Sequence, residues 1–350
     1  MNPNVVLPFL SSMLSFIFFV LLVDQWRERR RPYQAVWALG MLWYGLSAGT
    51  EFIGGAFGWS EMLYRIWYLI GAVWVAGWLG LGTMFLLGKT RFGLVVALSL
   101  FLAGLFTFLT QARYHYPNNA GAELIYFAIG LGLAVTVFVM TLRRDARWPN
   151  VVGLFVVIGS VAAAIMAFTA PLAAPGYVLN PQTHIPIGDL FPGYLRLLTP
   201  FFNITGAFAL SLGAVFSAYV FIPKKRLIRY EIRRDRGPVS VVGNILLAVV
   251  AIPVNFIASV PGALAALLGR RLNSRVPATI LIAIGGIIPA ITSGLNRFGD
   301  TSGFFVGELL GVVFLFLGFL VSIEVFRDVR VPFTKVVLWH RSAEEPTAAD

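Results

Sequence analysis

The sequence predicts an all-α protein: a polytopic transmembrane helix bundle of about nine spans plus one re-entrant helical hairpin. Hydrophobic residues make up 58% of the 350 residues and charged residues only 12%, whereas soluble domains hold about 45–50% apolar and about 25% charged residues. The apolar residues fall into runs of about 18–25, the length that a helix needs to cross a bilayer. Gly is also common, with 35 residues, and is better tolerated in transmembrane helices than in soluble ones.

Nine runs are predicted to cross the membrane. In chain order they cover about 4–23, 35–57, 63–87, 92–110, 124–142, 151–171, 197–222, 277–295 and 303–323. The longest loop between them, about 172–196, is too short to bury a core of its own, so we expect no soluble domain. This loop is rich in Pro and aromatic residues, which favours either a lid over a binding surface or a plug packed on the bundle.

The basic residues predict the orientation, because cytoplasmic loops are enriched in Lys and Arg. The loops after the first, third, fifth and seventh spans hold Arg27, Arg29, Arg30 and Arg31; Lys89 and Arg91; Arg143, Arg144 and Arg147; and Lys224, Lys225, Arg226, Arg229, Arg233, Arg234 and Arg236. These four loops must share one side, which we expect to be the cytoplasm. The predicted location is the cell (inner or plasma) membrane, with the N-terminus outside and the C-terminus in the cytoplasm.

One further apolar stretch, about 241–269, decides the rest of the topology. As an ordinary tenth span it places 17 of the 27 Lys and Arg residues inside, whereas a stretch that enters and leaves on the cytoplasmic side places 23 there. Pro breaks helices, and Pro253 and Pro261 lie in mid-run. We therefore predict a re-entrant hairpin of two short helices, about 241–252 and 261–270, with a Pro-kinked span as the alternative.

The chain is thus predicted to have four parts. They are a seven-span bundle at 1–222, a basic cytoplasmic linker at 223–239, the hairpin with two more spans at 240–325, and a cytoplasmic tail at 326–350. The linker is expected to bind anionic lipid head groups, because each basic residue near that surface adds about 1 kcal/mol. Nucleic-acid binding is not expected, since no recognition fold accompanies the charge.

Three segments carry a resemblance to a known family: WYGLSAGTEFIGGAF, LYRIWYLIGAVWVAGWLGLGTMFLL and GAVFSAYVF, which closes the seventh span. With their span number and orientation, the first 222 residues resemble the seven-span sensor region of some bacterial membrane histidine kinases. They also resemble stand-alone bacterial multi-pass membrane proteins of unassigned role. The resemblance implies a sensory role. It gives no catalytic residues, because further membrane segments follow where the kinases have a kinase domain.

Ionisable side chains within spans are costly in lipid unless paired, so each one is a functional candidate. The candidates are Glu51, Arg65 and Glu308, with Arg196 near the same surface and Tyr64 and Tyr68 as aromatic neighbours. Glu51 and Arg65 are predicted to line an outward-facing polar pocket and to pair. The alternatives are a structural ion pair that fixes two helices, and an interhelical hydrogen bond for Glu308. No charge falls at the central plane, which disfavours a proton-driven transporter.

The sequence predicts no metal site and no cofactor. It has no Cys, and its three His residues lie outside the spans, which argues against haem held between helices. P-loop, HExxH and GxSxG motifs are absent. An enzyme is therefore the least favoured class.

Two functions remain open. The first is a receptor-like or accessory module with an outward-facing polar pocket that acts through a membrane protein partner. The alternative is a transporter or channel for a small or lipid-like solute, since broken helices expose backbone groups to cargo. The residues of this alternative, all within 241–270, are Asn244, Pro253, Asn255 and Pro261.

Overall fold

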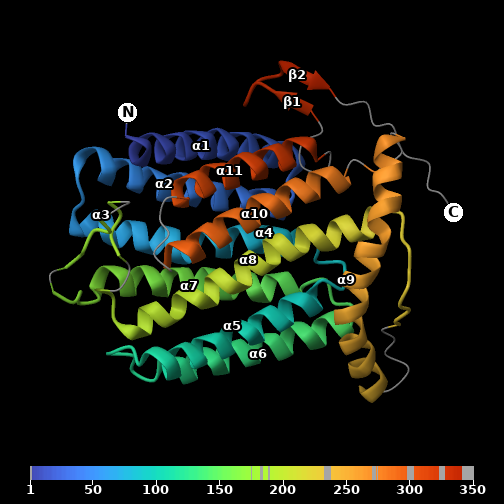
Figure 1. Cartoon of the computed structure of the whole chain (residues 1–350), viewed down its shortest axis with the longest axis horizontal. Coiled ribbons are helices and arrows are strands. Elements are labelled where there is room, and N and C mark those ends of the chain that lie inside the picture. Colours follow the sequence, from blue (N-terminus) through green and yellow to red (C-terminus); the bar gives the residue numbers. More distant parts are fainter. Residues whose placement is uncertain are drawn as a thin grey trace.

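The computed structural model describes residues 2–174, 176–181, 184–187, 190–231, 238–269, 273, 275–297, 303–322 and 328–340. Most of these residues are helical (Figure 1). The helices are α1 (Pro3–Arg29), α2 (Pro32–Phe57), α3 (Glu61–Trp67), α4 (Val75–Leu86), α5 (Gly93–Tyr114), α6 (Ala122–Leu142), α7 (Trp148–Thr169), α8 (Gly193–Phe221), α9 (Pro238–Leu268), α10 (Arg275–Arg297) and α11 (Phe304–Val321). A π-helix, η1 (Tyr68–Trp74), joins α3 to α4 without a break.

The chain is a multi-pass membrane protein. Nine helical stretches among the described residues are long and apolar enough to cross a membrane: α1, α3 to α4, α5, α6, α7, α8, Leu246–Ala266 of α9, Arg275–Ser293 of α10, and α11. Each of the nine ranges predicted as spans is helical, so the all-α bundle is confirmed. α2 is not among the nine but packs closely on α1 and α4.

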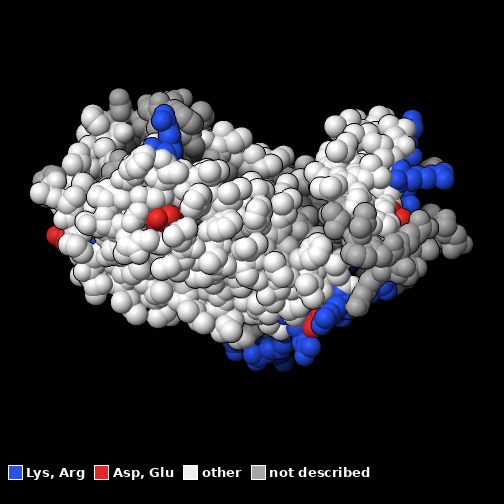
Figure 2. Space-filling view, turned by 90° about the horizontal axis from the view of Figure 1, so that it is seen from below, with Lys and Arg blue, Asp and Glu red and all other residues white. Residues whose placement is uncertain are grey.

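The loops alternate between two ends of the bundle. Figure 1 shows α1 to α8, α10 and α11 running along the long axis of the molecule, with α8 in contact with α4, α5 and α10. We call one end, where α1, α4, α6 and α8 finish, the basic end. Its described basic residues include Arg27, Arg29, Arg30, Arg31, Lys89, Arg91, Arg143, Arg144, Arg147, Lys224, Lys225, Arg226, Arg229 and Arg275. In Figure 2, Lys and Arg of the visible face gather mostly toward this end, and much of the remaining surface is uncharged.

Helices α4 and α8 cross at two glycines that admit no larger side chain. A Cβ atom on Gly80 would clash with the backbone of Gly206, and one on Gly206 would clash with the backbone of Ala76. Small residues let membrane helices approach closely, so that van der Waals packing holds them together. This crossing fixes α4, and with it η1, against α8.

The segment after the linker shares a hydrophobic core with the first helices. Phe319 of α11 packs edge-on against Trp37 of α2, with ring centroids 4.5 Å apart, and lies 5.1 Å from the ring of Phe18 in α1. The same buried cluster includes Leu210 of α8 and Ile282 of α10. Helices α10 and α11 are therefore packed into the bundle.

The predicted re-entrant hairpin is wrong. The helix α9 continues from Pro238 to Leu268 and passes through both Pro253 and Pro261. Both prolines lie on the exposed side of α9, so the carbonyl groups that they leave without a helical hydrogen bond face away from the bundle. The helix runs across the basic end (Figure 1), and α8 ends and α10 begins at this same end.

A β-hairpin follows α11, within the segment predicted as a tail. Strands β1 (Asp328–Arg330) and β2 (Val337–His340) pair antiparallel. The hairpin is attached to α1, because the N–H of Phe333 donates a 2.8 Å hydrogen bond to Asp24 Oδ1 and the Arg27 guanidinium lies 5.2 Å from the Phe333 ring centroid.

Candidate functional site

Two buried carboxyl groups meet between α2 and α11. Glu51 is 4% exposed, and its side chain interacts with that of Glu308. Neither Glu51 Oε2 nor Glu308 Oε2 receives a hydrogen bond from the described residues. Ionised carboxylates are acceptors only, whereas a protonated carboxyl group also donates. A proton shared between these two groups, here called the acidic pair, would supply the missing donor.

Two aromatic side chains hold the acidic pair in place. The indole N–H of Trp67 donates a 2.9 Å hydrogen bond to Glu51 Oε1. The hydroxyl group of Tyr44 donates a 2.8 Å bond to the backbone carbonyl of Glu308. The carboxyl group of Glu51 is thus tied to α3, and the backbone of Glu308 is tied to α2.

The π-helix η1 begins directly after Trp67. Short π-helical stretches are rare and occur frequently at functional sites. Here η1 lies close to α2, because a Cβ atom on Gly71 would be only 2.6 Å from Ser47 Oγ. The helix that leads into η1 starts at Ser60, whose hydroxyl group accepts a 3.2 Å hydrogen bond from the Leu63 N–H as an N-cap.

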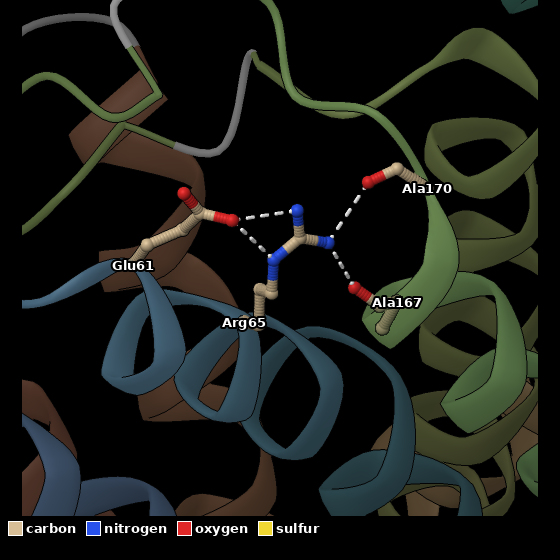
Figure 3. Close-up of polar contacts among 4 residues, drawn as sticks. All are labelled: Glu61, Arg65, Ala167 and Ala170. Atoms are coloured by element: carbon tan, nitrogen blue, oxygen red, sulfur yellow. Dashed lines mark hydrogen bonds and ion pairs between the residues drawn. The ribbon is translucent and has the colours of Figure 1, made fainter.

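The predicted ion pair between Glu51 and Arg65 is not formed. Arg65 instead pairs with Glu61 one turn earlier, at 2.8 Å, and donates through Nη1 to the carbonyls of Ala167 and Ala170 at 2.6 and 2.9 Å (Figure 3). These carbonyls lie at the C-terminal end of α7, where a cation is favoured by the helix dipole. Arg65 therefore fixes α3 to α7. Its positive charge is not paired with the acidic pair.

Tyr64 and Tyr68 lie beneath the loop that joins α7 to α8. Tyr64 donates a 3.2 Å hydrogen bond to the carbonyl of Ile187, and the Tyr64 and Phe191 rings are stacked with centroids 5.1 Å apart. The hydroxyl groups of Tyr68 and Thr199 are 3.0 Å apart. The described part of the loop is packed on the bundle in the manner of a plug, so these tyrosines support the loop.

Arg196 is separate from the acidic pair. Its guanidinium carbon lies 3.9 Å from the centroid of the Tyr116 ring, a cation–π arrangement that links the start of α8 to the loop between α5 and α6.

An apolar groove of about 1040 Å³ passes beside the site on the outer surface of α1 and α2. Its lining includes Phe9 and Leu21 of α1, Thr50 of α2 and Ile70 of η1, and Pro332 of the hairpin also contributes. Thr50 precedes Glu51, so the groove and the acidic pair share a turn of α2. The groove wall is almost entirely hydrocarbon, which suits an acyl chain better than a polar solute.

The broken-helix candidates of α9 do not meet at one site. Asn255 and Asn244 bind the backbone of the preceding linker, while Pro253 and Pro261 lie on the opposite, exposed side of the helix. The transport alternative therefore loses the broken helix on which it was based.

The arrangement can bind a proton or one small cation. In the described part of the chain, no group of three or more His, Cys, Asp or Glu residues could hold a metal ion. The sequence identified Glu51 and Glu308 as candidates but not their pairing, since 257 positions separate them along the chain. The contacts of Trp67 and Tyr44 depend on helix rotation, for which the sequence carries no short-range signal.

Comparisons with known protein families, with curated protein sequences and with solved structures give no match to this chain.

Proposed function

We propose that this multi-pass membrane protein is a receptor-like module whose sensing element is the acidic pair. The observation that carries the proposal is the meeting of Glu51 and Glu308 in a buried place where neither forms an ion pair with a described Lys or Arg. Ionisable groups at membrane depth are expensive when uncompensated, and they mark functional sites by default. A proton, or a small cation in its place, is the simplest ligand for two facing carboxyl groups.

Helix α11 offers a route from the acidic pair to the basic end. Glu308 lies in the second turn of α11, and Phe319 near its other end packs on Trp37 of α2. Loss of the bound proton places two like charges between α2 and α11, which favours their separation. Such a displacement would reach the hairpin that follows α11, where we propose that a membrane protein partner is contacted.

The orientation belongs to the same proposal. The basic end would face the cytoplasm of a bacterial cell, because cytoplasmic loops are enriched in Lys and Arg. The acidic pair, which lies toward the opposite end, would then sense the outside of the inner membrane.

The absence of Cys permits a direct test. A single Cys at Leu338 in the hairpin is labelled with an environment-sensitive fluorophore, and the protein in nanodiscs is titrated with acid and with Na⁺. We expect a reversible fluorescence change that the double variant Glu51→Gln/Glu308→Gln abolishes, since amides keep the shape but cannot ionise. The matched control is Glu61→Gln, which removes an exposed acid near the same end and should leave the response intact. A response that survives in the double Gln variant refutes the acidic pair as sensor.

Movement of a lipid-like solute remains the second candidate, and the groove beside Thr50 favours it. Proteoliposomes with an imposed pH gradient and a fluorescent phospholipid in one leaflet separate the two functions. A receptor-like module should dissipate neither the pH gradient nor the asymmetric distribution of the phospholipid. Saturable lipid movement that stops when Gly49 is replaced by Trp would favour transport, because this residue lines the groove.

A further inference from the structure

Wherever its side chains are described, the exposed surface of α9 is apolar. Every exposed position of this helix whose side chain is described is apolar, Gly or Pro. The large ones are Leu246, Leu247, Val249, Val250, Ile257, Val260, Leu264 and Leu268. Ile257 is 69% exposed and Leu268 is 87% exposed. A continuous apolar surface of this kind marks contact with a membrane or with another protein.

The polar side chains of α9 bind the linker that precedes the helix. Asn255 Oδ1 accepts hydrogen bonds from the N–H groups of Leu227 at 2.8 Å and Ile228 at 3.0 Å, and Asn255 Nδ2 donates to the Ile228 carbonyl at 2.8 Å. Asn255 thus binds an extended chain as the edge of a β-strand would. Its side chain is almost fully buried by this contact.

Two more side chains continue this attachment along the same face. Ser259 Oγ accepts a 2.9 Å hydrogen bond from the N–H of Lys225, and Asn244 Oδ1 accepts a 3.1 Å bond from the N–H of Glu231. Residues spaced by four and eleven positions lie on one side of an α-helix. The linker therefore runs antiparallel to α9 along one stripe, as Figure 1 also shows.

The linker supplies α9 with the charged face that the helix itself lacks. The side chains of Lys224, Lys225, Arg226 and Arg229 are exposed, whereas the backbone between them is bound to α9. Helix and linker together form an amphipathic body, apolar on the helix side and cationic on the linker side. Helices of this character lie in the plane of the membrane interface and bind anionic lipids.

The position of α9 agrees with an interfacial location. Phe256 and Ile252 of α9 pack against Tyr219 and Ile222 at the end of α8, and Val276 at the start of α10 completes the cluster. The helix is thus anchored where two bundle helices reach the basic end. Figure 2 shows the molecule projecting at the right-hand side, the side of α9, with a hollow between this projection and the rest of the upper surface.

We infer that α9 and residues 223–231 form one interfacial lipid-binding unit at the basic end. The apolar face of α9 lies among the acyl chains of one leaflet, and the four linker cations bind the phosphates of anionic phospholipids. On this inference α9 does not cross the membrane, although it is long and apolar enough to do so. Charge complementarity and the apolar face together specify the occupant as the anionic bilayer surface.

Spin labels on single Cys residues test the location of α9 in proteoliposomes of phosphatidylcholine and phosphatidylglycerol. Labels replace Val250, Ile257 and Leu264 on the apolar face, Leu227 on the linker, and Val161 in α7 as a bilayer reference. The ratio of oxygen to nickel-chelate relaxation reports the depth of each label. We expect one shallow depth for the three α9 labels, a greater depth for 161, and access to the aqueous chelate for 227.

Either of two other depth patterns overturns the inference. A depth that passes through the bilayer centre between 250 and 264 makes α9 a span. Chelate access at all three α9 positions places the apolar face in water, where a protein would have to cover it.

The lipid preference is tested separately with spin-labelled phosphatidylglycerol and phosphatidylcholine. The variant Lys224→Gln/Lys225→Gln/Arg226→Gln/Arg229→Gln should lose most of the preference for immobilising phosphatidylglycerol. The control Arg143→Gln/Arg144→Gln/Arg147→Gln removes charge from the same end but not from the linker and should retain it. Equal losses in the two variants, or no loss in the first, would contradict a linker site. Asn255→Ala should also make a label at Leu227 mobile, because it releases the linker backbone.

Discussion

The indole N–H of Trp67 donates to Glu51 Oε1 across 2.9 Å. Trp67 is the last residue of α3, and η1 begins at the next residue. The bond therefore connects the start of a π-helix with a carboxyl group that also interacts with Glu308 of α11. Helices α2, α3 and α11 therefore meet at one acidic side chain, so a change in its protonation would alter a contact of each of them.

Replacement of Trp67 by Phe should destabilise the protein by about 1–3 kcal/mol, because a buried carboxyl oxygen then loses its donor. The free energy of unfolding in detergent micelles measures the loss. The control is Trp78→Phe, which removes a 3.2 Å bond to a neutral partner, Ser160 Oγ, and should cost less. A cost for Trp67→Phe no greater than that of the control would show that the bond to Glu51 contributes little.

Arg65 should stabilise the protein mainly through its contacts with α7 rather than through its ion pair. Arg65→Met removes the pair with Glu61 and also the two bonds to the carbonyls of Ala167 and Ala170. Each of these two bonds involves a charged group and contributes about 1.5–3 kcal/mol. Glu61→Gln removes only the pair with an acid that is 58% exposed, and surface pairs contribute about 0–1 kcal/mol. Unfolding measurements on both variants distinguish these contributions. Similar costs for the two variants would mean that the ion pair, not the helix cap, is the main stabilising contact.

The helices could be predicted from the sequence because apolar runs of membrane-spanning length are a property of local composition. The continuation of α9 through Pro253 and Pro261 could not be predicted in this way. Proline was expected to break the helix at depth, but both prolines face away from the bundle, where an unbonded carbonyl can reach other partners. Burial of each face decides this outcome, and burial follows from tertiary packing.

The candidate site was predicted in part. Glu51 and Glu308 stand out as acids within apolar runs, which is a local signal. Arg65 was expected to neutralise Glu51 because their helices are joined by a short turn. The structure instead gives Arg65 a partner one helical turn away, Glu61, at the spacing where such pairs form readily. Which acid an Arg contacts depends on helix rotation, which the sequence leaves open.

Gly206→Ala should disrupt the crossing of α4 and α8, because the added Cβ would clash with the Ala76 backbone, which cannot rotate away. Overpacking of this kind typically costs about 1–3 kcal/mol. The control is Gly132→Ala in α6, where no atom lies within 4 Å of the added Cβ. There the higher helix propensity of Ala should stabilise the protein by up to about 1 kcal/mol. Thermal unfolding in detergent should therefore shift in opposite directions, and a shared direction would contradict the close crossing.

The bond between Asp24 and Phe333 should hold the hairpin on α1. Asp24 is only 2% exposed, and its Oδ1 accepts the Phe333 N–H at 2.8 Å. Asp24→Ala removes this acceptor, so hydrogen exchange of the backbone at 331–337 should become faster, while exchange in α11 stays slow. Asp145→Ala is a suitable control, because its bond to the N–H of Arg147 lies at the same end but outside the hairpin contact. Because the hairpin follows α11, its release should also uncouple the Leu338 fluorophore from the acidic pair. A full response in the Asp24→Ala protein would mean that the signal leaves α11 by another route.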